Sequence, residues 1–232
     1  MFDIEYKGIR STIKGVAVTR RPDIPAPEQN GEWVQIAGKD GEVFQWDGTY
    51  KDIEIPIPLN FVRARQYWME TYREIKAWLT GAGPLVMGDD PGWFYKCKSA
   101  RIHSTRRNVW VGGTLDARFV CDPYEYLAGA QSFLDKEEAL INPYAPAKPK
   151  YKIEGQGSCA LTVNGNVASV EVSGTIILDT DRMVAYTEDG TISNSAFDAG
   201  SNYEKLWLPT GQNDIEITQG FNLEIAPCWR SL

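Results

Sequence analysis

The length of the apolar runs constrains the fold most, because nearly all of them are short, alternate with polar residues and end at glycine, proline or Asp-Gly. Such runs are typical of β-strands joined by turns. Strand patterns occur at 3–18 (two short strands), 33–36, 43–46, 50–59, 93–101, 108–111 and 114–121, then at 159–163, 167–172, 175–179, 183–186, 207–208, 215–218 and 223–226. The chain is therefore predicted to be mainly β.

One segment has helical spacing. Apolar residues recur every three or four positions from Phe61 to Leu79, and Asn60 is placed to cap the first turn. Gly81 and Gly83-Pro84 end the pattern. The sequence predicts an amphipathic helix of about five turns, with one face laid on a sheet.

Prolines and glycines mark the connections. The segment 20–31 has three prolines within six residues, at 22, 25 and 27, so it is predicted to be an extended loop or arm. Pro56 and Pro58 restrict strand 50–59 to a sheet edge or a strand end. Turns are predicted at 38–41, at Asp47-Gly48 and at 164–166.

The pattern predicts two domains. Residues 1–140 form an α+β domain in which the long helix packs on β-sheets, residues 141–150 form a stiff proline-rich linker, and residues 151–232 form a β-sandwich. Residues 1–140 have 18 basic and 20 acidic side chains, and residues 141–232 have 6 and 11. The acidic excess is therefore concentrated in the second domain.

Composition excludes several classes of function. The 8 Trp, 11 Tyr and 8 Phe favour protein interfaces, whereas a net charge of −7 argues against general nucleic-acid binding. The N-terminus has no apolar signal core and no run of about 18 apolar residues follows, so we expect synthesis in the cytosol and no membrane segment. Cys97, Cys121, Cys159 and Cys228 are expected to be buried, reduced thiols.

No set of catalytic residues is evident. His103 is the one histidine, and it lies where a predicted strand enters a charged turn, so it is interpreted as a surface histidine and not as a catalytic base. The adjacent pair Asp89-Asp90 lies in a Pro-Gly turn, whereas glycosidases place two acids on either side of the scissile bond. The sequence therefore predicts no catalytic residues and no enzyme.

Cofactor and metal sites are not predicted either. No Cys-x-x-Cys pair occurs, and the carboxylates at 179–181 and 188–189 lack the pattern of a calcium loop, so they are interpreted as solvated turns. Gly112-Gly113 and Gly155-Gln156-Gly157 lead into strands and not into a helix that could bind phosphate. Arg106-Arg107 with Trp110 is interpreted as a solvated hairpin and not as a nucleic-acid patch.

Several segments, in this order and spacing, resemble the distal tail protein family of long-tailed siphophages (the siphovirus tail component). In the first domain these are 38–41, 50–57, 72–79, 85–90, the strand around Tyr95, and 116–123. In the second domain they are 161–165, 176–179, 208–213 and 225–230. The turn at 209–213 departs from the Pro-Gly-x-Asn pattern of the family, and the arm at 20–31 has no counterpart that we can align.

The resemblance implies a non-catalytic hexameric ring at the virion tail tip. The first domain forms the ring, and the second is a galectin-like sandwich that projects outward. The ring joins the tail tube protein to the baseplate, to a tail fibre or to a tail-associated lysin, with receptor-binding proteins as further partners. Its channel passes the tape measure protein and later the DNA.

Two other functions remain open from the sequence. A carbohydrate-binding adhesin could use Tyr186, Tyr203, Trp207 and Trp229 of the sandwich as stacking platforms for a host-surface sugar, although core packing is the commoner role for such residues. A tail-associated hydrolase is disfavoured because both a base and an opposed acid pair are missing.

Overall fold

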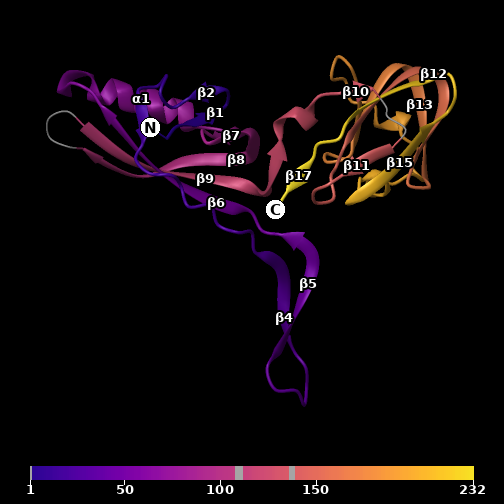
Figure 1. Ribbon diagram of the computed structural model, residues 1–232, viewed down its shortest axis with the longest axis horizontal. Coiled ribbons are helices and arrows are strands. Elements are labelled where there is room, and N and C mark those ends of the chain that lie inside the picture. The colour runs from indigo at the N-terminus through magenta and orange to yellow at the C-terminus, as the bar shows by residue number, and fades with distance from the viewer. Residues whose placement is uncertain (1, 108–111, 136–138) are drawn as a thin grey trace. The chain divides into compact units, whose positions relative to one another are not determined.

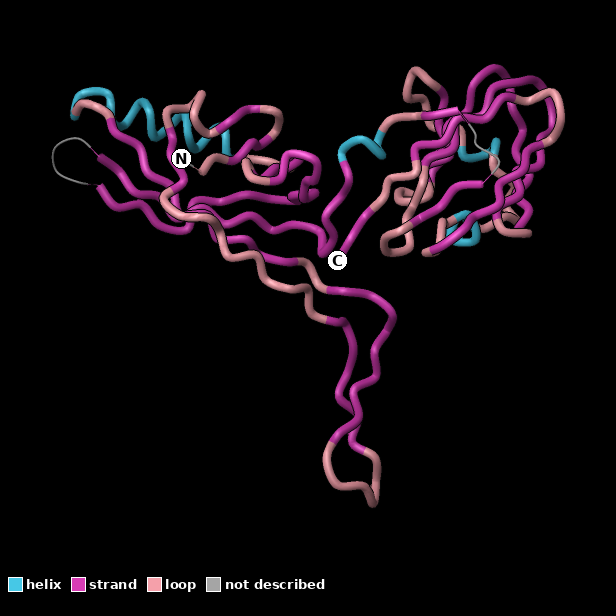
Figure 2. Tube along the Cα trace, in the orientation of Figure 1, coloured by secondary structure: helices cyan, strands magenta, loops and turns pink. Residues whose placement is uncertain are grey.

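The computed structural model describes residues 2–107, 112–135 and 139–232. The chain divides into two compact units, Met1–Glu125 with Leu232, and Tyr126–Ser231. Figures 1 and 2 show that strands dominate both units, as the sequence predicts. Within the described residues the one α-helix belongs to unit 1.

Unit 1 is built on a sheet with the strand order β2-β1-β7-β8-β9-β6-β3. Its strands are β1 (Ile4–Tyr6), β2 (Ile9–Arg10), β3 (Val16–Val18), β6 (Ile53–Val62), β7 (Gly83–Met87), β8 (Asp90–Arg107) and β9 (Gly112–Leu127), and the last two residues of β9 and its further partner β17 (Arg230–Ser231) belong to unit 2. Two further strands of this unit form a separate hairpin, described below.

Strand β6 shows how the prolines fit into this sheet. It pairs with β9 along its whole length, whereas β3 covers only Leu59–Phe61 on its other side. The main chain of Pro58 faces β3, since its carbonyl accepts a hydrogen bond from the N–H of Thr19 at 3.0 Å. Pro56 faces the same way but lies beyond the end of β3, where no N–H is needed. The predicted edge position is confirmed for this half of the strand.

The helix is shorter than predicted. Helix α1 spans Trp68–Leu79 after a single 3-10 turn at Arg65–Tyr67, and the predicted cap, Asn60, lies inside β6. Asn60 and Phe61 are opposite residues of both β3 and β9. Strands β3 and β9 thus pair with the main chain of this segment on both sides. A segment that began a helix would lose these partners.

Helix α1 packs on the core of unit 1 through one face. Its buried residues are Trp68, Thr71, Ile75, Trp78 and Leu79. Two indole N–H groups also fix the helix to the sheet, because Trp68 donates to the carbonyl of Gly112 and Trp78 to that of Tyr6, each at 3.1 Å. The helix is therefore oriented by hydrogen bonds as well as by apolar burial.

Strands β8 and β9 run beyond the predicted segments. The predicted end at Arg101 was wrong, because β8 continues to Arg107 and includes His103. Lys98 and Ser99 are both exposed, and burial resumes at Ala100 and Ile102, so the alternation shifts by one residue as in a β-bulge. The strand predicted at 108–111 lies outside the described residues.

Unit 2 is built on a seven-stranded sheet. Its main path is β10-β16-β12-β13-β14, and β15 pairs with both β11 and β12. The strands are β10 (Leu134–Asp135), β11 (Ala139–Asn142), β12 (Lys150–Val163), β13 (Asn166–Asp179), β14 (Val184–Thr187), β15 (Gly211–Ile217) and β16 (Asn222–Ala226).

Strand β12 changes partners half-way. Its first part, 150–154, pairs with β16, and its last part, 161–163, pairs with β15, while β13 follows it throughout. The change falls at Gly155-Gln156-Gly157, and a Cβ atom on Gly155 would lie 2.3 Å from the ring of Phe221. Glycine is required here because the ring packs against the main chain where the sheet curls.

The turn between β12 and β13 is as predicted. Asn164 and Gly165 are its two central residues, and both have positive φ, 49° and 78°. This geometry matches the twist of the two flanking strands, and Asn-Gly is the pair that adopts it most easily. The separate strands predicted on either side, however, are parts of two continuous 14-residue strands.

The predicted linker at 141–150 belongs to unit 2. Asn142 is buried and its amide donates to the carbonyls of Ala145 and Leu208, each at 3.0 Å. Ala147 is also buried and exchanges two main-chain hydrogen bonds with Leu208. The boundary between the two units therefore lies at Glu125 and not in the proline-rich segment 141–150. This segment is fixed by hydrogen bonds to Leu208, a contact that the local sequence does not reveal.

The chain end closes unit 2. The N–H of Leu127 donates to the carbonyl of Trp229 at 3.0 Å, and the N–H of Cys228 donates to that of Ala130 at 2.8 Å. Arg230 is buried and its Nε donates to the carbonyl of Pro146 at 2.6 Å. The first and last residues of the unit are thus paired with each other.

Candidate functional site

The candidate site is a β-hairpin of unit 1, which we call the aromatic hairpin. It consists of β4 (Gln29–Gln35), β5 (Glu42–Tyr50) and the loop 36–41, and the two strands pair only with each other (Figure 1). Trp33 lies opposite Phe44, and Val34 opposite Val43. The predicted turn at 38–41 is confirmed, with positive φ at Gly38 and Gly41.

Large apolar side chains of the aromatic hairpin face solvent. They are Trp33, Val34, Ile36, Val43 and Trp46, with exposures from 36% to 66%. Neighbouring residues such as Trp33 and Val34 point to opposite faces of the ribbon, so both faces are apolar. An isolated two-stranded hairpin is marginally stable in water. A ribbon of this kind is typical of a surface that binds another protein chain.

The base of the aromatic hairpin is organised by side chains. The ring of Trp46 packs on Tyr50 at 5.7 Å, and Tyr50 meets Tyr124 of β9 edge to face at 6.2 Å. The N–H of Lys51 donates to the carbonyl of Glu28 at 2.8 Å and closes the ribbon. These contacts connect the hairpin to unit 1 before any partner binds.

Asp47-Gly48 was predicted to be a turn, and this was wrong, since β5 continues through it. The pairing shifts register here, which is characteristic of a β-bulge. Asp47 Oδ1 accepts hydrogen bonds from the N–H and the hydroxyl of Thr49, at 2.8 and 2.7 Å. Trp46 Nε1 donates to the carbonyl of Thr49 at 2.8 Å, so the bulge fixes the orientation of this exposed indole.

Beside this bulge the hairpin surface is hollowed. A cavity of about 350 Å³ is lined by Asn30, Gly31, Glu32, Gln45, Trp46 and Asp47. Its lining combines one indole with two carboxylates and two amides, and it has neither a hydroxyl or thiol side chain nor a cation. The cavity can receive a side chain from a partner, and its chemistry is that of recognition.

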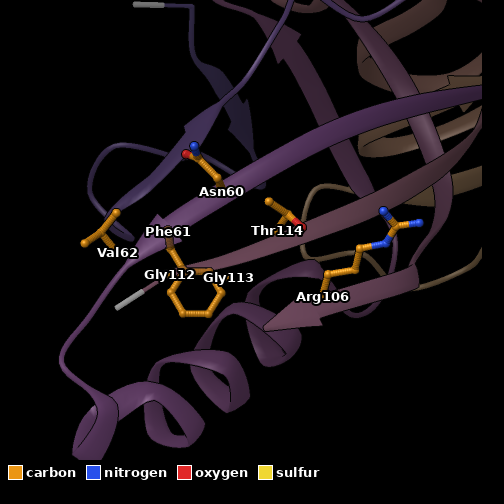
Figure 3. A pocket seen from close by; sticks show the side chains of 7 residues that line it. All are labelled: Asn60, Phe61, Val62, Arg106, Gly112, Gly113 and Thr114. Carbon is orange, nitrogen blue, oxygen red and sulfur yellow. The ribbon is translucent and has the colours of Figure 1, made fainter. Parts of the chain in front are cut away.

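A second hollow of about 320 Å³ lies where β6, β8 and β9 end, and Figure 3 shows its lining. The residues are Asn60, Phe61, Val62, Arg106, Gly112, Gly113 and Thr114. The ring of Phe61 fills the space that a Cβ on Gly113 would need, and the guanidinium of Arg106 points away from that ring (Figure 3). The polar side chains of this lining are one cation, one amide and one hydroxyl, which do not form a pair of general acid and general base.

The residues considered for catalysis lie apart. His103 is exposed on β8, and Asp90 begins that strand opposite Met87. Asp89 instead accepts a hydrogen bond from Nε of Arg21 at 2.6 Å. Of the residues considered as a nucleic-acid patch, Arg106 borders the second hollow and Trp110 lies outside the described residues.

The carboxylates considered for calcium serve as turn caps. Asp179 is buried and its Oδ1 accepts hydrogen bonds from the N–H groups of Asp181 and Arg182, at 3.1 and 3.0 Å. Asp189 accepts from Thr187 and Thr191, and these hydrogen bonds lower the pKa of its carboxyl. Within residues 2–107, 112–135 and 139–232, no three His, Cys, Asp or Glu side chains are grouped to hold a metal ion.

The four residues considered for sugar stacking are engaged in packing. Trp229 belongs to the core of unit 2, and Tyr203 stacks on Phe197 with ring centroids 4.0 Å apart. The ammonium of Lys148 lies over the ring of Trp207 at 4.9 Å, and Tyr186 is half-buried on β14. Burial, followed by the charge of Asp179, raises the pKa of Tyr203 to about 12.

The fold of this chain resembles that of a known protein. A scan against protein-family models and a search of curated proteins find no match. Among solved structures, the chain is similar to the crystal structure of SPP1 Dit (gp 19.1), named a paradigm of the hub adsorption apparatus in phages that infect Gram-positive bacteria. Identity is 17%, coverage is 100% of each chain and the TM-score is 0.69. The chain has the Dit fold.

The Dit fold confirms, at the level of structure, the resemblance predicted from the sequence. Because the match covers the full length of both chains, it includes the aromatic hairpin and unit 2. Among the described residues, no helix combines the length and the apolar character needed to cross a bilayer.

The sequence predicted the two strands of the aromatic hairpin but not its role. The available signal was Trp33-Val34-Gln35-Ile36, where apolar residues occupy both faces of a strand. A strand of a one-sided sheet alternates apolar with polar residues. Loss of alternation beside a long glycine-containing loop therefore points to a ribbon that a partner covers.

Proposed function

We propose that this chain is a structural distal tail protein of a siphophage. Six copies form a ring hub at the virion tail tip, which joins the tail tube to the baseplate or tail fibre and leaves a channel for DNA. The single observation that carries the proposal is the aromatic hairpin, exposed on both faces within a Dit fold. The likeness to a hub adsorption protein supports the location and the partners.

The aromatic hairpin supports a closed ring in particular. The apolar ribbon of one subunit must bind a different surface on its neighbour, because pairing two ribbons with each other forms only a dimer. When each subunit binds the next through two unlike surfaces, the copies close into a ring if a whole number of these rotations makes one full turn. The number six follows the family resemblance, and the channel is the space around the ring axis.

A structural role is also consistent with the chemistry of the described residues. His103 is exposed on β8, and Asp89 is paired with Arg21. The lining of the second hollow has no carboxylate or imidazole, and in the first hollow the carboxylate of Asp47 is engaged by the N–H and the hydroxyl of Thr49. We therefore propose that the chain contributes assembly and not catalysis to the tail, and that it uses no cofactor.

The test is the oligomeric state of the full chain as a function of concentration. Native mass spectrometry and negative-stain images of the wild-type protein should show six-membered rings. The double variant Trp33→Ser, Trp46→Ser should weaken assembly about 100-fold or more, because buried tryptophans at interfaces are often binding hot spots. The matched control, Ile13→Ser with Ile192→Ser, removes side chains that are 74% and 66% exposed outside the hairpin.

The control should assemble like the wild type, and the circular dichroism of the tryptophan variant should match that of the wild-type monomer. A wild-type protein that stays monomeric at high concentration contradicts the ring. Unchanged assembly of the tryptophan variant contradicts the role of the aromatic hairpin.

A further inference from the structure

Two of the four cysteines meet in the core of unit 1. All four are free and buried, which confirms the sequence prediction of buried thiols. Cys97 lies on β8 and Cys121 on β9, which are neighbours in the sheet, and their exposures are 3% and 0%. Cys159 and Cys228 lie in unit 2.

The contacts around Cys97 and Cys121 place them across from each other. The two thiols share a hydrogen bond across the adjacent strands β8 and β9, and both are buried in the same core cluster. Opposed residues of antiparallel strands have Cα atoms about 4.5–5.5 Å apart. Disulfides form at Cα separations of roughly 4.4–6.8 Å, so these strands are already close enough.

The surroundings of the pair make the two thiols unequal. The hydroxyl of Tyr6 donates to Cys97 Sγ at 3.7 Å, and Cys97 Sγ lies 3.2 Å from the carbonyl of Ser99. The hydrogen bond from Cys121 lowers the pKa of Cys97, and the same bond raises the pKa of Cys121. Cys97 is therefore the thiol that ionises first and attacks.

We propose that Cys97 and Cys121 form an oxidation site that closes as an intramolecular disulfide between β8 and β9. The thiolate of Cys97 attacks one sulfur of a small disulfide oxidant and displaces its other half as a thiolate. Cys121, deprotonated in turn, attacks the sulfur of Cys97 and releases the second half. Two electrons pass to the oxidant and the two thiol protons pass to the released thiolates.

Burial determines the kinetics of this reaction. An oxidant reaches Cys97 only when β8 and β9 separate locally, so oxidation of the native protein is slow. Once formed, the bond is shielded from reductants in the same way. If the proposed tail function is right, the change follows release of the virion from the reducing cytosol. The chemistry itself depends only on the two strands.

The experiment uses the purified full chain, fully reduced and then incubated with oxidised glutathione. Intact mass should fall by two hydrogen atoms per chain, and a non-reducing peptide map should show one linkage, Cys97 to Cys121. The melting temperature of the protein should rise by about 5–10 °C, because the bridge restricts the unfolded chain. Reductant added to the unfolded protein should reverse the mass change.

Two double variants serve as controls. Cys159→Ser with Cys228→Ser keeps the pair and should still lose two hydrogen atoms, whereas Cys97→Ser with Cys121→Ser should not. Four free thiols after oxidation of the wild type overturn the proposal, as does a map in which other cysteines, glutathione or a second chain is attached. The wild-type map decides the question even if a variant fails to fold, and ring formation is measured separately.

Discussion

Two β-hairpins of this chain have similar local structure and opposite surroundings. Strands β12 and β13 of unit 2 pair over 14 residues, and their inward side chains, such as Leu161 and Val170, are fully or almost fully buried. Strands β4 and β5 pair over a shorter length, and their apolar side chains face solvent. The first hairpin has β14, β15 and β16 as neighbours, whereas no other strand of the described residues pairs with the second.

The difference shows that pairing alone does not bury a ribbon. An antiparallel pair satisfies only one side of each strand, and its side chains are removed from water only by further strands or by another chain. Unit 2 supplies those strands itself. The aromatic hairpin has the apolar side chains of a core, but no further strand of the described residues pairs with it, so it is expected to be marginally stable by itself.

The largest expected effect compares the same substitution in both hairpins. Val170→Ala on β13 should lower the free energy of unfolding by about 2–3 kcal/mol, because it removes two buried methyl groups and leaves a cavity. Val43→Ala on β5 should change it by less than about 0.5 kcal/mol in the monomer, since Val43 is 36% exposed. Urea unfolding of each variant measures the difference, and equal losses would contradict the comparison.

A smaller effect is expected where β12 changes partners. Gly155→Ala should lower the free energy of unfolding by about 1–2 kcal/mol, because the new methyl group meets the ring of Phe221. Adding Phe221→Leu should recover part of this loss, since a smaller side chain frees the space. Gly155 has a φ of 157° and Gly157 one of 102°, so Gly157→Ala is not an equivalent control and the double-mutant cycle isolates the ring contact. Additive losses would show that ring contact is not the cause.

The smallest effect concerns Tyr203, whose buried hydroxyl has no hydrogen-bond partner within the part of the chain that the structure describes. Tyr203→Phe should raise the free energy of unfolding by about 1 kcal/mol at neutral pH. Because the folded state raises the pKa of Tyr203 from 10.0 to about 12, its neutral form is favoured by folding. That contribution is complete below pH 10 and is lost as pH rises towards 12. Thermal melts of both proteins between pH 7 and 12 test this, and a less stable phenylalanine variant refutes it.

Much of the fold could be predicted from local sequence. Alternation located most strands, and the glycine-containing turns at 38–41 and 164–165 were predicted correctly because positive φ is a local requirement. The burial of the cysteines followed from their chemistry. None of these predictions needed knowledge of which strands are neighbours.

The errors arose where a distant strand decides the local structure. Asn60 was predicted to cap a helix, but β3 and β9 pair with it as part of a strand. The prolines at 141–150 were taken for a linker, whereas Leu208 holds Ala147 in unit 2. The aromatic hairpin was missed because Trp33 and Trp46 are exposed. No further strand of the described residues pairs with β4 or β5, and the sequence of the hairpin does not reveal this.

The pairing of Leu127 with Trp229 also affects how unit 2 forms during synthesis. The two residues are hydrogen-bonded although almost the entire unit lies between them in sequence. Contacts of such separation slow folding, because a long loop must close before they form. Trp229 must leave the ribosome before unit 2 can close. Until then the half-made sheet exposes its edges, and premature termination near Trp229 should yield protein that aggregates.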